Sequence, residues 1–218
     1  MNKESKLSLK NFTQCLVLFA VFILYTVVVK FVDVSAIGPM GSTVGLSGIN
    51  GAFAETFGYN EAFYQISKYL GYAVLGVAAC FAFLGLFQLV TRKSIKEVDP
   101  AIMILGGFYL IVIGFYVLFE AIVINYRPVI LDEGLEASYP SSHTMLAICV
   151  AVSGLIMLKR YIKNRTVLTA VRCFLIAVTA AVVVFRLFSG VHWFSDILGS
   201  VILSASLCAG FKELVSFK

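Results

Sequence analysis

Charged residues are scarce in this sequence: they make up 13% of its 218 residues, whereas hydrophobic residues make up 60%. In soluble globular domains about a quarter of the residues are charged, and the mean hydropathy of +0.95 is far from such a composition. The scarcity of charge excludes an ordinary soluble domain and predicts a protein of the lipid bilayer.

Cysteine patterns that build disulfide frameworks or thiolate metal sites are also lacking. The sequence has five cysteines, and no two of them have the spacing of a CxxC motif. All five fall in apolar runs: Cys15, Cys80, Cys149, Cys173 and Cys208. We interpret them as small buried hydrophobic side chains, so neither structural disulfides nor a cysteine-bound metal is expected.

Long apolar runs are what the sequence does contain. A membrane-spanning helix needs about 20 mainly apolar residues. Such runs occupy residues 12–31, 63–90, 101–124, 144–158, 167–187 and 193–211. The first run is too long for the core of a signal peptide and is interpreted as a retained helix. We therefore predict an all-α integral membrane protein with six transmembrane helices, in which residues 1–218 form a single membrane-embedded domain.

Lysine and arginine are distributed unevenly between the two ends of these spans. If the N-terminus is cytoplasmic, the cytoplasmic segments are 3–10, 92–96, 159–165 and 212–218, which hold most of the basic residues. The opposite ends hold only Lys30, Lys68, Arg127 and Arg186. By the positive-inside rule, we expect a multi-pass protein of the cell membrane with both termini in the cytoplasm. Because the basic residues are scattered over four segments, the net charge of +5 does not indicate nucleic-acid binding.

The longest connection between the spans, residues 33–61, is rich in glycine. Small residues alternate there with apolar ones. This pattern is compatible with a short helix on the outer membrane surface and equally with a flexible loop.

The polar residues that topology does not explain gather at the ends of the third to sixth spans, opposite the termini. Ionisable residues are costly inside a membrane and are therefore candidates for function. The third span ends in EAIVINYRP, residues 120–128. Seven residues make almost two helical turns, so Glu120 and Arg127 are predicted to share a helix face. An outward arginine suits bidentate binding of phosphate oxygens; the alternative is an arginine that snorkels to the interface.

The fourth span begins with YPSSH, residues 139–143. Proline fits the first turn of a helix, and the free N–H groups there, together with the hydroxyls of Ser141 and Ser142, can bind an anion. His143 would then reach the bound anion. The alternative is a simple helix cap with an incidental histidine.

The fifth and sixth spans meet in RLFSGVHWFSD, residues 186–196. His192 and Asp196 are four residues apart, so on one helix they would lie on the same face, where the carboxylate can hold the imidazole tautomer. Arg186 would supply a second phosphate clamp. The alternative, a buried structural His–Asp pair, is disfavoured because both histidines of the chain fall at the same membrane face.

Taken together, these segments resemble the signature of the type 2 phosphatidic acid phosphatase superfamily: K-x6-R-P, then P-S-G-H, then S-R-x5-H-x3-D. The match covers residues 100–200, and the order, the spacings and the positions at helix ends agree. The resemblance implies a phosphatase site at the outer ends of helices 3 to 6, within the six-helix membrane branch of the family.

The resemblance also implies a role for each matching residue. His192 would attack phosphorus, with Asp196 orienting it, and His143 would protonate the leaving oxygen and later activate water. The phosphoryl oxygens would be held by Arg127, Arg186, Ser141 and the amide of Ser142. No metal ion or other cofactor is implied.

Three positions depart from the family pattern. Phe185 stands where the family has the serine, Ser142 replaces the glycine, and Glu120 replaces the lysine. The change at Glu120 matters most, because exchanging a cation for an anion disfavours a dianionic phosphate. Three outcomes are open: Glu120 turns aside and pairs with Arg127 or Lys68, the substrate or a bound cation compensates for its charge, or turnover is weakened.

We expect hydrolysis of a lipid phosphate or lipid diphosphate at the non-cytoplasmic face, with membrane lipids around the substrate. Candidate substrates are undecaprenyl diphosphate, phosphatidylglycerol phosphate and phosphatidate, and the motif does not discriminate among them. The main alternative is a catalytically weakened relative that binds phospholipid or a partner protein, although such a relative has no chemical need for His143, His192 and Asp196. A metal-dependent hydrolase with those three ligands is disfavoured by the neighbouring arginines, and a transporter by the lack of a convincing mid-span charge.

Overall fold

The computed structural model describes residues 3–131 and 134–216, and these residues are almost entirely helical. The α-helices are α1 (Lys3–Phe31), α2 (Ser47–Phe57), α3 (Glu61–Arg92), α4 (Pro100–Ala121), α5 (Ser142–Tyr161), α6 (Arg165–Phe188) and α7 (Phe194–Ser216). Two short 3-10 helices, η1 (Pro39–Gly41) and η2 (Ile95–Glu97), lie in connections.

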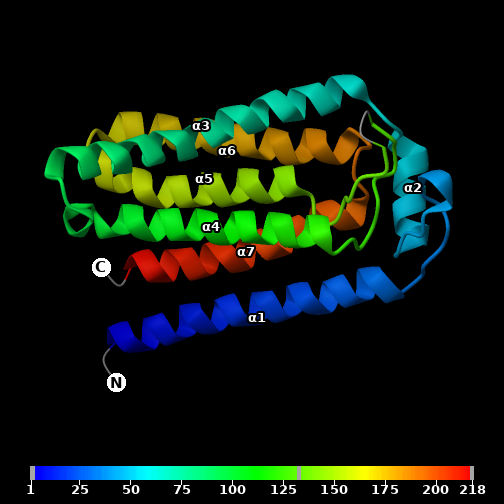
Figure 1. Cartoon of the computed structure of the whole chain (residues 1–218), viewed down its shortest axis with the longest axis horizontal. Coiled ribbons are helices and arrows are strands. Elements are labelled where there is room, and N and C mark those ends of the chain that lie inside the picture. The colour runs from blue at the N-terminus through cyan, green and yellow to red at the C-terminus, as the bar shows by residue number, and fades with distance from the viewer. Residues whose placement is uncertain (1–2, 132–133, 217–218) are drawn as a thin grey trace.

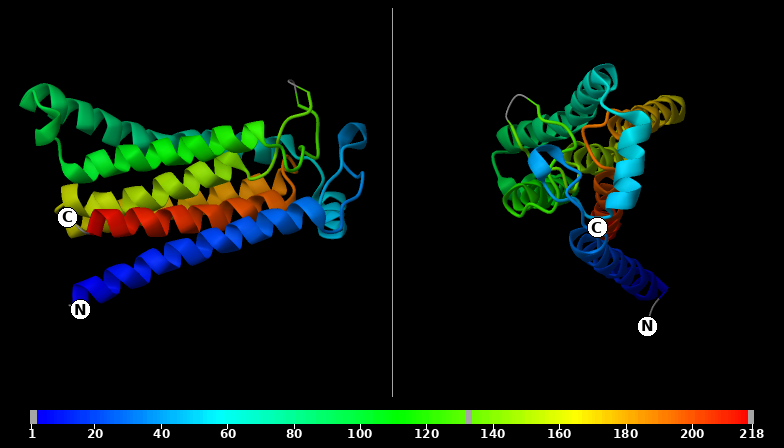
Figure 2. Two further views of the ribbon diagram at one scale, coloured as in Figure 1. Left: turned by 60° about the horizontal axis from the view of Figure 1, so that its bottom comes forward. Right: turned by 90° about the vertical axis from the view of Figure 1, so that its right-hand side faces the viewer.

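Six of these helices, all except α2, are long and apolar enough to cross a membrane. This confirms the predicted all-α fold with six spans. The helices run along the long axis of the molecule, with both chain ends at one end and α2 across the other (Figure 1). Viewed from two further sides, α1 diverges from the other helices toward its N-terminus (Figure 2). The most buried spans are α5 and α7, so they form the centre of the bundle.

The third span ends earlier than the apolar run suggested. We predicted a helix over residues 101–124, but α4 stops at Ala121 and Ile122 has a non-helical backbone. The main-chain carbonyl of Asn125 accepts hydrogen bonds from the amide of Ser138 (2.9 Å) and from its hydroxyl (3.1 Å). These tertiary contacts bend the chain out of the helix.

At the opposite end of the bundle, a polar cluster ties α4 to α5. Asp99 caps α4 by accepting from the amide of Ala101 (2.9 Å). The same carboxylate accepts from the hydroxyl of Tyr161 (2.8 Å) and lies 3.8 Å from Arg160. This end of the α4–α5 pair is therefore fixed by side chains.

The connection over residues 33–61 forms η1 and α2, and two asparagines join it to the turn between α6 and α7. Asn50 is buried; its amide nitrogen donates to the carbonyl of Gly45 (2.8 Å) and to the hydroxyl of Ser195 (2.9 Å), and its oxygen accepts from the Ser195 amide (3.1 Å). The Asn60 amide donates to the carbonyl of Ser189 (3.0 Å). Helix α2 is thus held across the same end of the bundle as the three sequence motifs.

Candidate active site

His192 lies in the tight turn between α6 and α7 and is 4% exposed. The turn requires glycine at position 190, where φ is +69° and a Cβ atom would lie 2.0 Å from the carbonyl oxygen of Gly58. On the other side of His192, the indole of Trp193 donates to the main-chain carbonyl of Tyr126 (2.7 Å). The imidazole is therefore placed by contacts with two other connections of the chain.

The Nδ1 atom of His192 faces two oxygen acceptors. It lies 3.1 Å from the main-chain oxygen of Ser138 and 3.7 Å from the carboxylate of Asp196. A carbonyl oxygen can only accept, so Nδ1 carries the proton and Nε2 keeps its lone pair. Nε2 is buried and has no hydrogen-bond partner within residues 3–131 and 134–216. This is the arrangement that a nitrogen nucleophile needs.

Asp196 lies beside His192, as predicted, but a turn rather than a shared helix face brings the two side chains together. The two residues do not share a helix, because α7 begins only at Phe194. The carboxylate of Asp196 accepts from the Trp193 amide (2.9 Å), which closes the turn in front of the helix. The expected proximity is present, but the shorter contact of the imidazole is with Ser138.

The environment of His192 favours its neutral form. Burial and the positive charges of Arg186 and Arg127 hold its pKa well below the usual range, although the hydrogen bond to Ser138 acts in the opposite direction. A neutral imidazole is the form that can attack phosphorus.

Arg186 is in the last turn of α6 and is almost fully buried, at 1% exposed. Its guanidinium lies 5.3 Å from the centre of the Tyr64 ring on α3, a cation–π contact. Its Nε and Nη2 atoms have no acceptor among the described residues. A buried guanidinium with free donors is suited to bind an anion.

His143 is the second residue of α5 and is also flanked by α3. A Cβ atom at Gly71 would come within 3.9 Å of the His143 ring, so α3 passes close to the imidazole. His143 at the start of α5, Arg186 at the end of α6 and His192 in the turn after α6 lie at the same end of the bundle. These three side chains form the centre of a cluster of nitrogen-bearing residues.

Arg127 reaches this cluster from the connection after α4. Its amide donates to the main-chain oxygen of Glu136 (3.0 Å), and its guanidinium pairs with the carboxylate of Glu136 (2.8 Å). The prediction that Glu120 and Arg127 share a helix face is wrong, because α4 has ended before Arg127. The Nε atom of Arg127 remains without a partner among the described residues.

The two serines before His143 differ in their availability. Ser141 is the N-cap residue of α5 and is buried; its hydroxyl donates to Thr144 (3.1 Å) and its amide to the main-chain oxygen of Asp196 (3.2 Å). Ser142 is the first residue of the helix, where amide N–H groups have no intrahelical acceptor. The α5 N-terminus thus offers main-chain donors, while the Ser141 hydroxyl is engaged within the fold.

Glu120, in the last turn of α4, lines a small pocket together with Ser142 and His192. It forms no salt bridge in the described part of the chain, and Arg127 pairs with Glu136 instead. Of the expected outcomes, pairing of Glu120 with Arg127 or Lys68 is therefore not observed.

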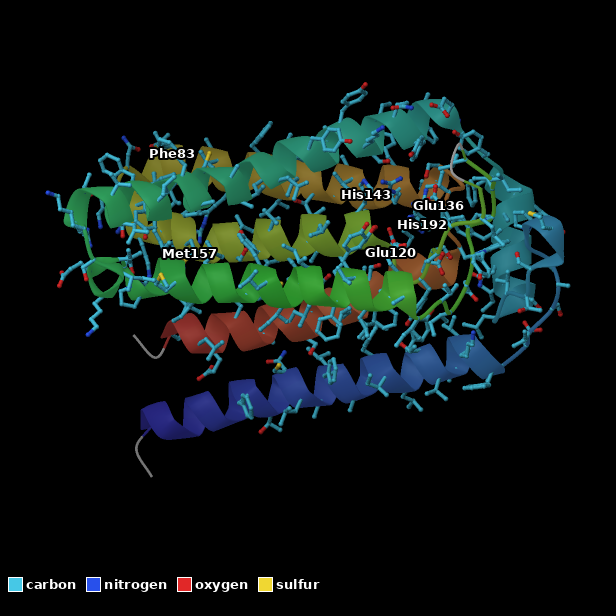
Figure 3. The ribbon with its side chains drawn as sticks, viewed as in Figure 1. Phe83, Glu120, Glu136, His143, Met157 and His192 are labelled. Atoms are coloured by element: carbon cyan, nitrogen blue, oxygen red, sulfur yellow. The ribbon has the colours of Figure 1, made fainter. Side chains whose placement is uncertain are left out.

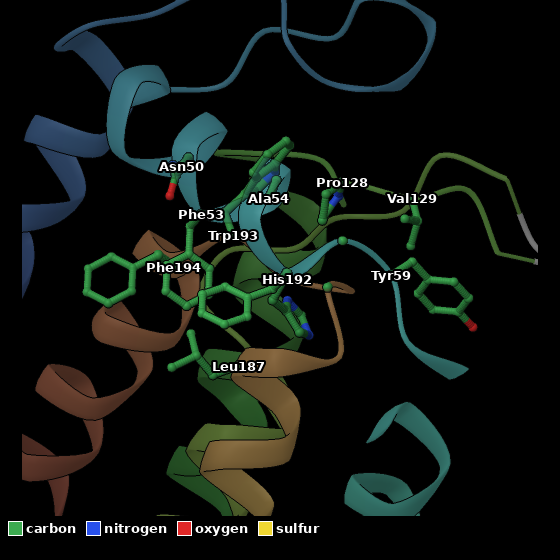
Figure 4. A pocket seen from close by; sticks show the side chains of 13 residues that line it. Asn50, Phe53, Ala54, Tyr59, Pro128, Val129, Leu187, His192, Trp193 and Phe194 are labelled. Carbon is green, nitrogen blue, oxygen red and sulfur yellow. The ribbon is translucent and has the colours of Figure 1, made fainter. Parts of the chain in front are cut away.

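A second pocket, of about 140 Å³, borders His192 beneath α2. Its walls are mostly apolar and include Phe53, Leu187, Trp193 and Phe194. Figure 4 shows these side chains gathered around the imidazole. One side of the imidazole therefore borders a mostly apolar pocket.

The common feature of the cluster is a set of buried nitrogen atoms without partners. Among the described residues, these are Nε of Arg127, Nδ1 of His143, Nε and Nη2 of Arg186, and Nε2 of His192. Figure 3 shows His143, His192, Glu120 and Glu136 at the same end of the bundle. Unpaired buried polar groups are costly, so this concentration indicates a site for an anion. No group of three or more His, Cys, Asp or Glu side chains in the described residues is placed to hold a metal ion.

Sequence reasoning missed several residues of this site. Ser138 contacts His192 through its main chain, so its side chain gives no signal of that contact. Asn125 and Glu136 belong to a connection without regular structure, and no spacing in the sequence indicates the contacts that they make in the folded chain. Tyr64 and Gly71 on α3 could have been found from their spacing, which places both on one helix face.

Comparison with known proteins identifies a family and a similar fold. The family model for the PAP2 superfamily matches residues 73–218. The crystal structure of a transmembrane PAP2-type phosphatidylglycerolphosphate phosphatase from Bacillus subtilis has a similar fold, with a TM-score of 0.58 and 19% sequence identity. The similarity covers 91% of this chain and 94% of that one. No curated protein sequence matches the chain.

Proposed function

The chain belongs to the PAP2 superfamily of membrane phosphatases, and from this premise we propose that it hydrolyses a lipid phosphate or lipid diphosphate through a phosphohistidine intermediate, without a metal ion. The observation that carries the proposal is the set of partnerless nitrogens of Arg127, His143, Arg186 and His192 at one end of the bundle, within the described residues. Two imidazoles and two guanidiniums are the groups that phosphoryl transfer to histidine requires.

In the first step, Nε2 of His192 attacks phosphorus and the bond from phosphorus to the leaving oxygen breaks. His143 gives a proton to that oxygen, so that the alcohol, or the lipid monophosphate in the case of a diphosphate, leaves neutralised by one proton. The Nδ1–H of His192 stays on the carbonyl of Ser138, with Asp196 at 3.7 Å to stabilise the charge of the phosphorylated ring.

In the second step, His143 takes a proton from water, and the water oxygen attacks phosphorus. The bond between phosphorus and Nε2 breaks, orthophosphate leaves, and His192 returns to its starting form. Arg127, Arg186 and the amide groups at the α5 N-terminus would stabilise the equatorial oxygens in both transition states. The Ser141 hydroxyl takes a smaller part in this proposal than the family pattern implies, because it donates to Thr144.

We place the site on the non-cytoplasmic face of the cell membrane. Support comes from the basic residues in segments 92–96 and 159–165, which lie at the bundle end opposite the site. A lipid could keep its tail in the bilayer while its headgroup enters the site. Phosphatidylglycerol phosphate is a first candidate because the B. subtilis relative is a phosphatidylglycerolphosphate phosphatase; undecaprenyl diphosphate and phosphatidate are the others.

The test is phosphate release by purified protein in detergent, with EDTA present, from these three lipids. We expect turnover by the parent and a loss of about 10³-fold or more in His192→Ala, because removing a nucleophile abolishes the covalent route. Lys163→Ala, at the far end of the bundle, is the control. Equal rates for the parent and His192→Ala would refute the enzymatic proposal, and activity that needs added zinc would refute its metal independence.

The alternative function is a weakened relative that binds phospholipid or a partner protein. It is favoured by one observation, the carboxylate of Glu120, which has no salt bridge among the described residues and shares a pocket with His192. Vesicle binding without phosphate release from any of the three lipids would select this alternative.

A further inference from the structure

One face of α3 is directed at the candidate site. Tyr64 contacts the guanidinium of Arg186 at 5.3 Å, and Gly71 lies against the ring of His143. Lys68 is four residues after Tyr64 and three before Gly71, so it lies between them on the same helix face. Lys68 therefore lies on the face of α3 that carries these two contacts.

Lys68 is available to bind a ligand. It is partly buried and forms no salt bridge among residues 3–131 and 134–216. The nearest acidic residue along the helix, Glu61, accepts hydrogen bonds from Tyr59 and Gln65.

The site has less positive charge than a phosphate dianion requires, and the ammonium group of Lys68 would add one positive charge. Arg127 is paired with Glu136, and Glu120 adds a carboxylate to the wall of the pocket that contains His192. Of the two arginines of the site, only Arg186 then holds its charge without an acidic partner among the described residues. A phosphate dianion carries two negative charges, and the single unpaired guanidinium of Arg186 balances only one of them.

We propose that Lys68 is a phosphate-binding residue of this site and replaces the lysine whose position Glu120 occupies. The inference rests on the proposed function, because it assigns Lys68 to the same phosphoryl group. Lysine is suited to this role because its ammonium is a compact charge on a flexible stem, with three donors that can adjust to phosphate oxygens. The cation would thus be contributed by α3, whereas α4 has Glu120 at the position of the family's lysine.

The test uses orthovanadate and inorganic phosphate as probes, so that affinity can be measured by calorimetry whether or not a substrate is known. In Lys68→Gln we expect both anions to bind about ten- to a hundredfold more weakly, the range that the loss of one charged hydrogen bond gives. Lys68→Arg keeps the charge and should stay within about threefold of the parent. Lys163→Gln removes the same charge at the far end of the bundle and should bind like the parent.

A structural role for Lys68 would give a different pattern. If Lys68→Gln lowered the melting temperature while the fraction of folded protein bound vanadate normally, the inference would be overturned. Affinities within about twofold of the parent in both Lys68→Gln and Lys163→Gln would also overturn it. The enzymatic proposal can fail independently of this inference. If the parent protein binds phosphate through Lys68 but releases no phosphate from lipids, the enzymatic proposal is refuted and the inference about Lys68 stands.

Discussion

His192 donates its Nδ1 proton to the main-chain carbonyl of Ser138 across 3.1 Å. This contact selects the tautomer in which Nε2 has the lone pair, and Nε2 is the nitrogen that faces no partner in the described residues. A main-chain acceptor cannot be protonated at physiological pH, so the tautomer does not depend on the ionisation of Asp196. Positioning of the His192 ring is thereby shared between the loop before α5 and the first turn of α7.

The residue that holds both acceptors of His192 in place is Asn125. Its main-chain carbonyl binds Ser138, and its side-chain amide donates to Asp196 (3.4 Å). Asn125→Leu keeps the main-chain bonds to Ser138 but removes the amide donor to Asp196, so we predict that turnover falls about tenfold while His192 keeps its Nδ1–H tautomer. The chain has two histidines, so the ¹⁵N spectrum of histidine-labelled protein reports on each ring.

The matched control for this prediction is Asn164→Leu, at the opposite end of the bundle, where Asn164 caps α6. It should leave turnover and the imidazole spectrum unchanged. Turnover of Asn125→Leu equal to that of this control would rule out a positioning role for the Asn125 side chain, and mixed tautomers of His192 in Asn125→Leu would contradict tautomer selection by Ser138.

Acid should destabilise the protein through His192. Its pKa in the folded state is well below the usual value of about 6.5, so on acidification the unfolded chain takes up a proton that the folded chain does not. This stabilising contribution is complete above about pH 6.5 and is lost as the pH falls toward the folded-state pKa, at a rate of at most about 1.4 kcal/mol per pH unit. Between pH 7 and 5, unfolding in detergent should therefore show a smaller loss of stability in His192→Asn than in the parent. Identical pH dependences would contradict a buried neutral His192.

Glu120→Lys should tighten vanadate inhibition, by about tenfold or more, because it removes an anion from the site and adds a cation. Glu55→Lys makes the same charge change on the exposed surface of α2 and serves as the control. If the inhibition constant of Glu120→Lys equals that of the control, Glu120 does not face the bound anion.

The orientation of the chain is tested by labelling. Thr56→Cys on α2 and Lys96→Cys at η2 place exposed thiols at opposite ends of the bundle. A membrane-impermeant maleimide added to intact cells should modify the cysteine at position 56 and spare the one at position 96 until the cells are opened. The reverse pattern would place the site in the cytoplasm.

The helices, and the end of the bundle at which the polar motifs gather, could be predicted from the sequence because both depend on local signals. Apolar runs of sufficient length must become helices in a bilayer, where each main-chain polar group needs a partner within its own segment. The ends of these helices carried the arginines and histidines in recognisable spacings. The position of Arg127 relative to Glu120 could not be predicted in this way, because α4 ends where Asn125 finds partners in Ser138 and Asp196, which are remote in the sequence.

The sequence by itself determined that the chain is a six-span membrane protein and that Arg127, His143, Arg186, His192 and Asp196 lie toward one end of it. Only the tertiary structure decided which groups meet there: the Ser138 carbonyl at Nδ1 of His192, Glu136 at Arg127, and the ring of Tyr64 on α3 at Arg186. The physical reason is that spans form from hydrophobicity and main-chain hydrogen bonding within each segment. Contacts of the site, in contrast, depend on how connections without regular structure fold over the helix ends.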